Sequence, residues 1–213
     1  PCALAQPAKP CFVSLFLPAS ASKPPRPLLA GEPRYATCPI TFDSVNARSP
    51  AHSVRLARYH SLFSGAFGHT YGANQVCQMY SPGLFEPVLE ARFPWYEALH
   101  LEGAGDIIHA RRLLESVDFT SSTPAPELLP YGGDDADMAV AVRGDGFVWV
   151  YMPHGNPVEF ASGGLRVRSA HWYDPRTGES LRAAKPKRGA PCHRIVPPTS
   201  GFGHDWIYIL QTK

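Results

Sequence analysis

The stretch MAVAVRGDGFVWVYM, residues 138–152, decides the fold class of this part of the chain. Two runs of valine, alanine and aromatic residues, 138–143 and 147–152, flank the turn sequence GDG at 144–146. β-Branched and aromatic runs on either side of a short Gly/Asp turn are typical of a β-hairpin. We therefore predict two neighbouring antiparallel strands here.

The sequence after this hairpin keeps the same character. Short apolar or alternating runs at 158–160, 167–173 and 204–210 are separated by turn signals, without a helical pattern between them. Several short strands without intervening helices favour antiparallel sheets packed face to face. We therefore predict a small antiparallel β-sandwich over residues 131–213.

Residues 171–179 (HWYDPRTGE) contain the clearest turn of this second domain. Proline and glycine stand where a β-turn needs them, and the Asp174 carboxylate can accept hydrogen bonds from backbone amides. We expect Trp172 to pack between the sheets, and Asp205 and Trp206 to be a paired carboxylate and a core residue. The alternative for this segment is a ligand-binding edge.

A basic stretch follows that turn, and it consists of Arg182, Lys185, Lys187, Arg188 and Arg194. A solvated loop is the usual structure of such a stretch, and a polyanion site is the alternative. The whole chain contains only 18% charged residues and has a formal net charge of +2. That balance predicts no broad attraction to nucleic acid or to an anionic membrane.

Helical patterns dominate the sequence before the hairpin. A helix is predicted over about 49–66, because a serine suits the N-cap and a proline suits the first helical position. Further helices are predicted over 94–99 and 106–117, the second from apolar residues at helical spacing. The Ser/Thr/Pro-rich stretch 120–130 is typical of a linker, and we place a domain boundary at its end.

Two short strands are predicted among these helices. Residues 28–32 (LLAGE) form an apolar run that ends in a carboxylate and is stopped by Pro33. Residues 76–80 (VCQMY) follow the glycine-bracketed turn 68–72 (GHTYG).

Residues 1–23 are rich in proline, alanine and serine, and we predict a poorly ordered segment there. Within it, apolar residues 11–17 precede small residues at 19–21, which resembles a signal-peptide core and cleavage site. The alternative is a buried strand.

The sequence contains no motif of a common cofactor, metal or membrane site. Its five cysteines are scattered without CxxC spacing, so we expect no zinc site, while one or two disulfide bonds stay compatible with the sequence. We find no P-loop or dinucleotide fingerprint and expect no cofactor. No apolar run approaches the roughly 20 residues of a spanning helix.

Three segments together resemble one protein family. They are 26–35 (RPLLAGEPRY), 59–72 (YHSLFSGAFGHTYG) and 171–179, with HDW at 204–206. They resemble the apiosidase-like glycoside hydrolases, whose (β/α)₈ barrel precedes a β-domain labelled as the collagen-binding domain of a collagenase. The resemblance implies an α/β plus β fold: residues 24–130 would be the late strands and helices of a barrel, followed by the β-sandwich. A whole barrel needs roughly 250 residues, so only part of one fits here.

The same resemblance implies a catalytic role for Glu32. The segment around Glu32 is similar to a late barrel strand of the family, whose Glu is a catalytic carboxylate, and barrel enzymes place their chemistry at this end of the strands. The alternative is a solvated turn residue. The sequence departs from the family at Ala36, where a second Glu is usual, and at Cys77, where Trp is usual; both departures put activity in doubt.

Five residues are predicted to bind a sugar substrate: Tyr35, His69, Tyr71, Asn74 and Gln78. Tyrosine and histidine can bond hydroxyl groups and stack on a sugar ring. Strand alternation would place Asn74 and Gln78 on one face. The alternative is that the glycines around His69 serve a tight turn and that His69 caps backbone groups. Asp43 and Glu86 lie in predicted loops and could act only as substitutes for the missing second carboxylate, and solvated loop charges are the stronger interpretation of both.

The sequence thus predicts a fragment similar to a glycoside hydrolase, weak or inactive alone, that acts on a carbohydrate polymer or oligosaccharide. The alternative is a non-catalytic β-sandwich that binds or supports a polymer, either a glycan or, by the family label, collagen. The resemblance implies a secreted protein. A half barrel would expose sheet edges, so we also expect the isolated chain to self-associate.

Overall fold

A computed structural model describes residues 16, 19, 27–43, 45–133, 137–162, 164–190 and 192–213. The predictions for residues 1–23, including the signal-like segment, fall outside the described residues except at positions 16 and 19.

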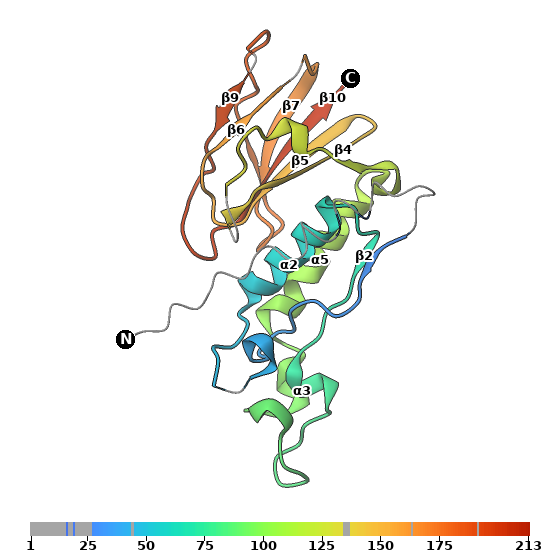
Figure 1. The fold of residues 1–213 in the computed structure, drawn as a ribbon, viewed down its shortest axis with the longest axis vertical. Helices are drawn as coiled ribbons and strands as arrows, with labels where there is room; N and C mark the ends of the chain where they lie inside the picture. Colours follow the sequence, from blue (N-terminus) through green and yellow to red (C-terminus); the bar gives the residue numbers. More distant parts are fainter. Residues whose placement is uncertain are drawn as a thin grey trace.

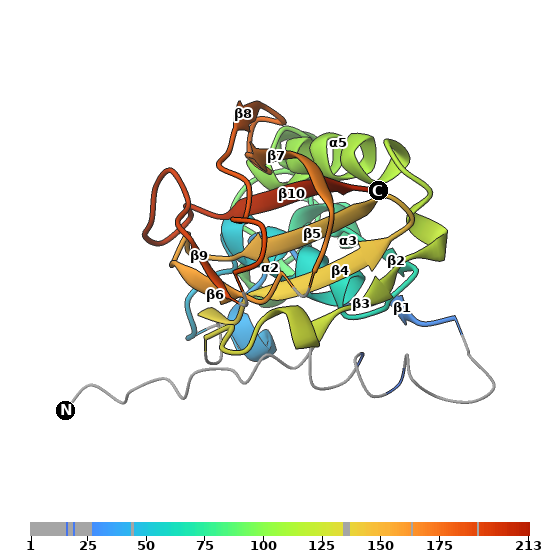
Figure 2. The ribbon, with the colours of Figure 1, turned by 90° about the horizontal axis from the view of Figure 1, so that it is seen from above.

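A six-stranded antiparallel sheet forms the centre of the molecule, with the strand order β3-β4-β5-β10-β7-β8 (Figures 1 and 2). The strands are β3 (Thr123–Pro124), β4 (Val140–Gly144), β5 (Phe147–Met152), β7 (Val167–Tyr173), β8 (Ser180–Arg182) and β10 (Trp206–Thr212). The last strand, β10, lies in the middle and pairs with both β5 and β7. The predicted hairpin and the predicted strand at 167–173 are confirmed.

A two-stranded ribbon covers one face of this sheet. It pairs β6 (Val158–Phe160) with β9 (His193–Ile195). Phe160 and Ile195 of the ribbon share a core with Val150, Trp172 and Tyr208 of the large sheet. The packing between two antiparallel sheets is therefore as predicted, although β8 and β9 lie in the stretch that was interpreted as a solvated basic loop.

Two helices cover the other face of the sheet, α2 (Ala51–Phe63) and α5 (Glu102–Glu115) (Figure 1). They pack side by side and bring Phe63 and Leu113 against Trp149 and Tyr151 of β5. The central strands of the sheet are thus buried on both faces. All six residues of β5 are buried, which explains a strand without polar alternation.

A parallel strand pair lies beyond the helices. β1 (Leu29–Ala30) pairs with β2 (Gly68–His69), and α2 connects them, so the three elements form a short β-α-β unit. A parallel bridge between Ala36 and Ala73 continues the pairing. This arrangement agrees with a piece of an α/β structure, and its membership of a barrel stays a prediction.

The strand predicted at 76–80 is wrong, because the chain forms the short helix α3 (Asn74–Cys77) there. Val76 and Cys77 donate backbone hydrogen bonds to the Ala73 carbonyl, and Tyr80 donates to the Gln75 carbonyl. A short apolar run has no period that separates strand from helix, and here local bonding decided.

The remaining elements are short. They are α4 (Trp95–Ala98), and the 3₁₀ turns η1 (Ile40–Phe42), η2 (Val88–Glu90), η3 (Phe119–Ser121) and η4 (Pro126–Leu128). The helices predicted at 94–99 and 106–117 correspond to α4 and α5, and α2 begins one residue after Pro50. Strand β3 lies inside the predicted linker, so the large sheet begins at Thr123.

Cys38, Cys77 and Cys192 are free thiols. Within the described residues, the helices are all too short or too polar to cross a membrane.

Candidate active site

Two parallel segments bring most of the predicted site residues together. Residues 29–36 and 68–73 run side by side, held by backbone hydrogen bonds from Thr70 to Ala30 (3.1 Å) and from Ala36 to Gly72 (2.8 Å). Glu32 and Tyr35 lie on the first segment, and His69 and Tyr71 lie on the second.

Glu32 is exposed and follows the end of β1 by two residues. Its carboxylate lies near the Tyr35 phenol, whose pKa is raised first by burial and then by the Glu32 charge. A Cβ atom on Gly72 would lie 2.7 Å from the Tyr35 ring, so only glycine permits this close approach. Glu32 and Tyr35 are thus three positions apart beyond the end of β1, and the Glu32 charge acts on the Tyr35 phenol.

His69 and Tyr71 lie on the helix side of the strand pair. Burial and the neighbouring Arg58 of α2 lower the pKa of His69 to about 3. Burial raises the pKa of Tyr71 to about 12, against the effect of Arg58. The Tyr71 ring also lies 3.4 Å from the position of a Cβ on Gly103 in α5. These two side chains are thus neutral groups packed against α2 and α5.

Arg58, His69 and Tyr71 form a buried polar cluster. Arg58 is only 4% exposed, and burial lowers its pKa. The two terminal nitrogens of Arg58, both ring nitrogens of His69 and the Tyr71 hydroxyl have no hydrogen-bond partner among the described residues. Buried polar atoms of this kind are usually satisfied by water. The predicted sugar contacts of His69 and Tyr71 stay predictions, since both residues face this interior cluster.

Asn74 and Gln78 bond to each other and to a neighbouring loop. The Gln78 amide donates to the Asn74 side-chain oxygen (3.0 Å) and to the Val88 carbonyl (3.0 Å), and it accepts from the Val88 amide (2.8 Å). Asn74 donates to the carbonyls of Val88 and Leu89, both at 3.3 Å. Their contacts hold η2 against α3, and a role in substrate binding stays a prediction.

Asp43 and Glu86 are both exposed. One Asp43 oxygen accepts a hydrogen bond from the Val45 amide, as in a solvated turn. Neither residue forms an ion pair within the part of the chain that the structure describes. The described residues also contain no cluster of histidine, cysteine, aspartate and glutamate that could hold a metal ion.

An ionic network that sequence analysis missed joins α2, α5 and the start of β10. The Arg55 guanidinium bonds to Asp205 (3.0 Å), Asp106 (2.8 Å) and Glu102 (3.1 Å), and the Tyr151 hydroxyl donates to Asp205. Burial lowers the pKa of Arg55, but the bonds and charges of Asp205 and Asp106 outweigh burial and raise it. The predicted pairing of Asp205 is confirmed, and its partner lies 150 residues away.

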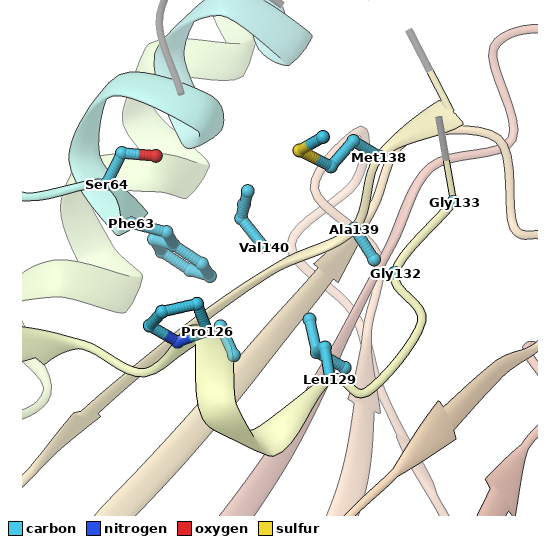
Figure 3. Close-up of a pocket in the computed structure, with 10 residues that line it drawn as sticks. Phe63, Ser64, Pro126, Leu129, Gly132, Gly133, Met138, Ala139 and Val140 are labelled. Atoms are coloured by element: carbon cyan, nitrogen blue, oxygen red, sulfur yellow. The ribbon is translucent and has the colours of Figure 1, made fainter. Parts of the chain in front are cut away.

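A hollow of about 280 Å³ lies between the end of α2, η4 and β4 (Figure 3). Phe63, Pro126, Leu129 and Val140 line it largely with hydrocarbon. Its lining contains no carboxylate and no histidine, so it offers none of the groups that glycoside hydrolysis requires.

Comparison with known proteins identifies the family of this chain. The family described as "Apiosidase-like, catalytic domain" matches residues 14–121, which is half of the chain. This chain belongs to the apiosidase-like family. The description "Putative collagen-binding domain of a collagenase" matches residues 124–211 of this apiosidase-like chain, which are β3 to β10. No curated protein matches it.

Two solved structures are similar to this apiosidase-like chain. One, named "Glycoside hydrolase", is 27% identical with a TM-score of 0.85, and the match covers 95% of this chain and 46% of that one. The other is a glycoside hydrolase family 5 protein from Bacteroides vulgatus ATCC 8482, 24% identical with a TM-score of 0.85, covering 95% and 45%. Because this second structure is only 24% identical to the chain, its similarity supports the fold alone. The chain spans less than half the length of both structures.

Proposed function

We propose that this apiosidase-like chain is part of a glycoside hydrolase that cleaves glycosidic bonds in a polysaccharide, with Glu32 as one of its two carboxylates. The observation that carries this proposal is the position of Glu32. It is exposed just beyond β1, within the residues that match the catalytic domain. Carboxylates at the ends of parallel strands are where barrel enzymes place their chemistry.

The proposed chemistry needs a second carboxylate. One group protonates the leaving oxygen while the other attacks or activates water, at a separation of about 5–5.5 Å for retention or 6.5–9.5 Å for inversion. The resemblance implies a partner carboxylate on an early barrel strand, and Ala36 stands where a further Glu is usual in the family. We therefore propose that the second group comes from a part of the barrel outside this chain, and that the chain alone is weak or inactive.

The open side of β1 and β2 supports this incompleteness. Within the described residues, the two strands pair only with each other. Leu29 on β1 is 50% exposed, and Phe67 beside β2 is 67% exposed. A closed barrel pairs every strand on both sides and buries such groups.

The test is hydrolysis of a panel of aryl glycosides and pectic oligosaccharides. The chain, its Glu32→Gln variant and a matched Glu115→Gln control on the exposed face of α5 are compared. Turnover that Glu32→Gln abolishes and Glu115→Gln preserves supports the proposal in full. If the chain is inactive, adding the missing barrel region of a relative in the same polypeptide should produce turnover that depends on Glu32. Turnover unaffected by Glu32→Gln refutes the role of Glu32.

The match of residues 124–211 favours a second candidate function, in which the sheet domain binds or supports a polymer. Pull-down of the chain on insoluble polysaccharides and on fibrillar collagen separates the two polymer classes. Retention on either one in the absence of turnover favours this second function. Because a polymer is found outside the cell, we also propose that the protein is secreted. Detection of a tagged full-length protein in the culture medium tests this.

A further inference from the structure

A groove of about 410 Å³ lies between α5 and the far edge of the large sheet, on the face that the helices cover. Its polar lining comes from both halves of the molecule: His109 and Arg112 on α5, and His171, Ser180 and Gln211 on β7, β8 and β10. Its volume is in the range of small-ligand sites. This groove is separate from Glu32 and from the cluster around Arg58.

The Arg112 side chain lines this groove, and the strand register places Arg182 next to the lining residue His171. Arg112 opposes the rise that burial causes in the pKa of Tyr173, so its charge lies close to the Tyr173 phenol. Arg182 on β8 stands opposite His171 in the antiparallel register, and residues opposite each other share a face of the sheet. Neither arginine forms an ion pair within the described residues.

The lining contains no carboxylate. The nearest acidic groups on the same elements are already paired: Glu115 bonds Arg111 at 2.7 Å, and Asp174 bonds Arg176 at 2.6 Å. Glu179 is exposed in the β7–β8 turn and lies outside the lining. Among the residues that line the groove, Arg112 therefore carries a positive charge and none carries a negative charge.

The walls of the groove are held in place before any ligand arrives. The Tyr173 hydroxyl donates to the His109 carbonyl at 2.8 Å, which ties β7 to α5. Gly178 has a φ of +76°, and a Cβ there would lie 2.5 Å from the His109 ring. The turn after β7 thus lies directly against α5, and Leu113 and Ile209 supply an apolar floor.

We propose that this groove binds the anionic group of an acidic oligosaccharide, a carboxylate or a sulfate, through Arg112 and Arg182. Guanidinium groups bind planar or tetrahedral oxyanions through paired N–H donors. The rings of His109 and His171 add hydrogen-bond donors. That the anion belongs to a sugar rests on the proposed function, whereas the anion preference rests on the groove alone.

Isothermal titration calorimetry of the full chain with three trisaccharides tests this. They are trigalacturonate, a sulfated galactotriose and neutral galactotriose. We expect the acidic trisaccharides to bind and the neutral one to bind at least tenfold more weakly. Arg112→Gln and Arg182→Gln should each lower the affinity for the acidic ligand at least tenfold. Arg111→Gln, one position away and paired with Glu115, should change it less than twofold.

The outcomes separate this inference from the catalytic proposal. Binding of only the uronate or only the sulfated trisaccharide identifies the source of the anion and supports the inference. Equal binding of the neutral trisaccharide, equal losses in Arg111→Gln and Arg112→Gln, or no binding of an acidic trisaccharide overturns it. Calorimetry of Arg112→Gln tests the groove and hydrolysis by Glu32→Gln tests the catalytic proposal, so each proposal can fail while the other holds.

Discussion

The two halves of this molecule complete their cores to different extents. In the sheet half, from Thr123 onward, large apolar side chains are buried on both faces of the six-stranded sheet. In the preceding half, strands β1 and β2 have two residues each, and within the described residues only the isolated bridge between Ala36 and Ala73 extends their pairing. Eleven of the fifteen large apolar side chains that are exposed within the described residues lie before residue 122.

This difference indicates that α2 and α5 belong structurally to the sheet as much as to the strand pair. Their apolar side chains bury one sheet face, and Arg55 connects them to β10 through Asp205. The first half is therefore held by its contact with the second, and among the described residues no further strand pairs with β1 or β2 on its other side.

The largest expected effect comes from breaking the connection between the halves. Arg55→Met leaves Asp205 and Asp106 buried without their cation, which costs about 3–5 kcal/mol of unfolding free energy. Urea unfolding at neutral pH measures this. The control Arg143→Gln removes an exposed pair with Glu127 and should cost about 0–1 kcal/mol. Similar losses in both variants would mean that the network does not join the halves.

Acid should also weaken the contact between the two halves, through His60 on α2. Its Nε2 donates to the Met138 carbonyl at 2.8 Å, and its Nδ1 is buried without a partner among the described residues. Burial lowers the pKa of His60 to about 4, below the unfolded value of roughly 6.5. The unfolded chain therefore binds more protons between these values, so stability is full above about pH 6.5 and falls as the pH drops toward 4, by about 3 kcal/mol.

Thermal unfolding of the His60→Gln variant across that pH range measures this contribution. We expect a smaller loss of stability on acidification than in the parent chain, although His52 and His69, whose pKa values are also lowered by burial, keep part of the dependence. Replacing the exposed His100 by Gln should leave the pH dependence unchanged. An unchanged dependence in His60→Gln would contradict the assignment.

A moderate effect is expected within the first half alone. Gln78→Ala removes two hydrogen bonds between α3 and Val88, and a net loss of about 1–2 kcal/mol follows from the usual value of such bonds. Chemical denaturation measures it, with Glu86→Gln as a nearby exposed control within about 0.5 kcal/mol. If Gln78→Ala left the free energy of unfolding unchanged, the Gln78 side chain would not be needed for stability, and a role in substrate binding would be favoured.

The smallest effect on stability is expected on the open side. Phe67→Ser should change the unfolding free energy by no more than about 0.5 kcal/mol, because the ring is 67% exposed. It should reduce self-association in sedimentation velocity, whereas Val196→Ser in the sheet half, at 59% exposure, should not. A parent chain that is monomeric at all concentrations would show that the open side is not adhesive.

Local patterns predicted the elements whose signal is contained in a few neighbouring residues. The strands at Val158–Phe160 and Val167–Tyr173 have the predicted bounds, because turns on either side stop each run. Strands β8 and β9 were missed, because the first is fully exposed and the second lies in a basic, proline-interrupted stretch. Such edge strands exist through their partners, and a partner is not visible in the strand's own residues.

The site shows the same limit. The apolar run before Glu32 was enough to place it at a strand end, and that placement agrees with the structure. The orientation of His69 toward Arg58 depends on the parallel register of β1 and β2 and on α2 above them. Asn74 and Gln78 were grouped because a strand was predicted there. The structure has α3 instead, and the two residues are hydrogen-bonded because they lie one helical turn apart.

The sequence by itself determined the hairpin, the helix positions, the turn at Asp174 and the family, since each depends on residues that are close together in the chain. Only the tertiary structure decided that α2 and α5 cover the sheet, that Arg55 meets Asp205, and that Arg112 and His171 line one groove. The physical reason is that charge pairing and burial depend on distance in space. Residues 150 positions apart become neighbours only when the whole chain has packed.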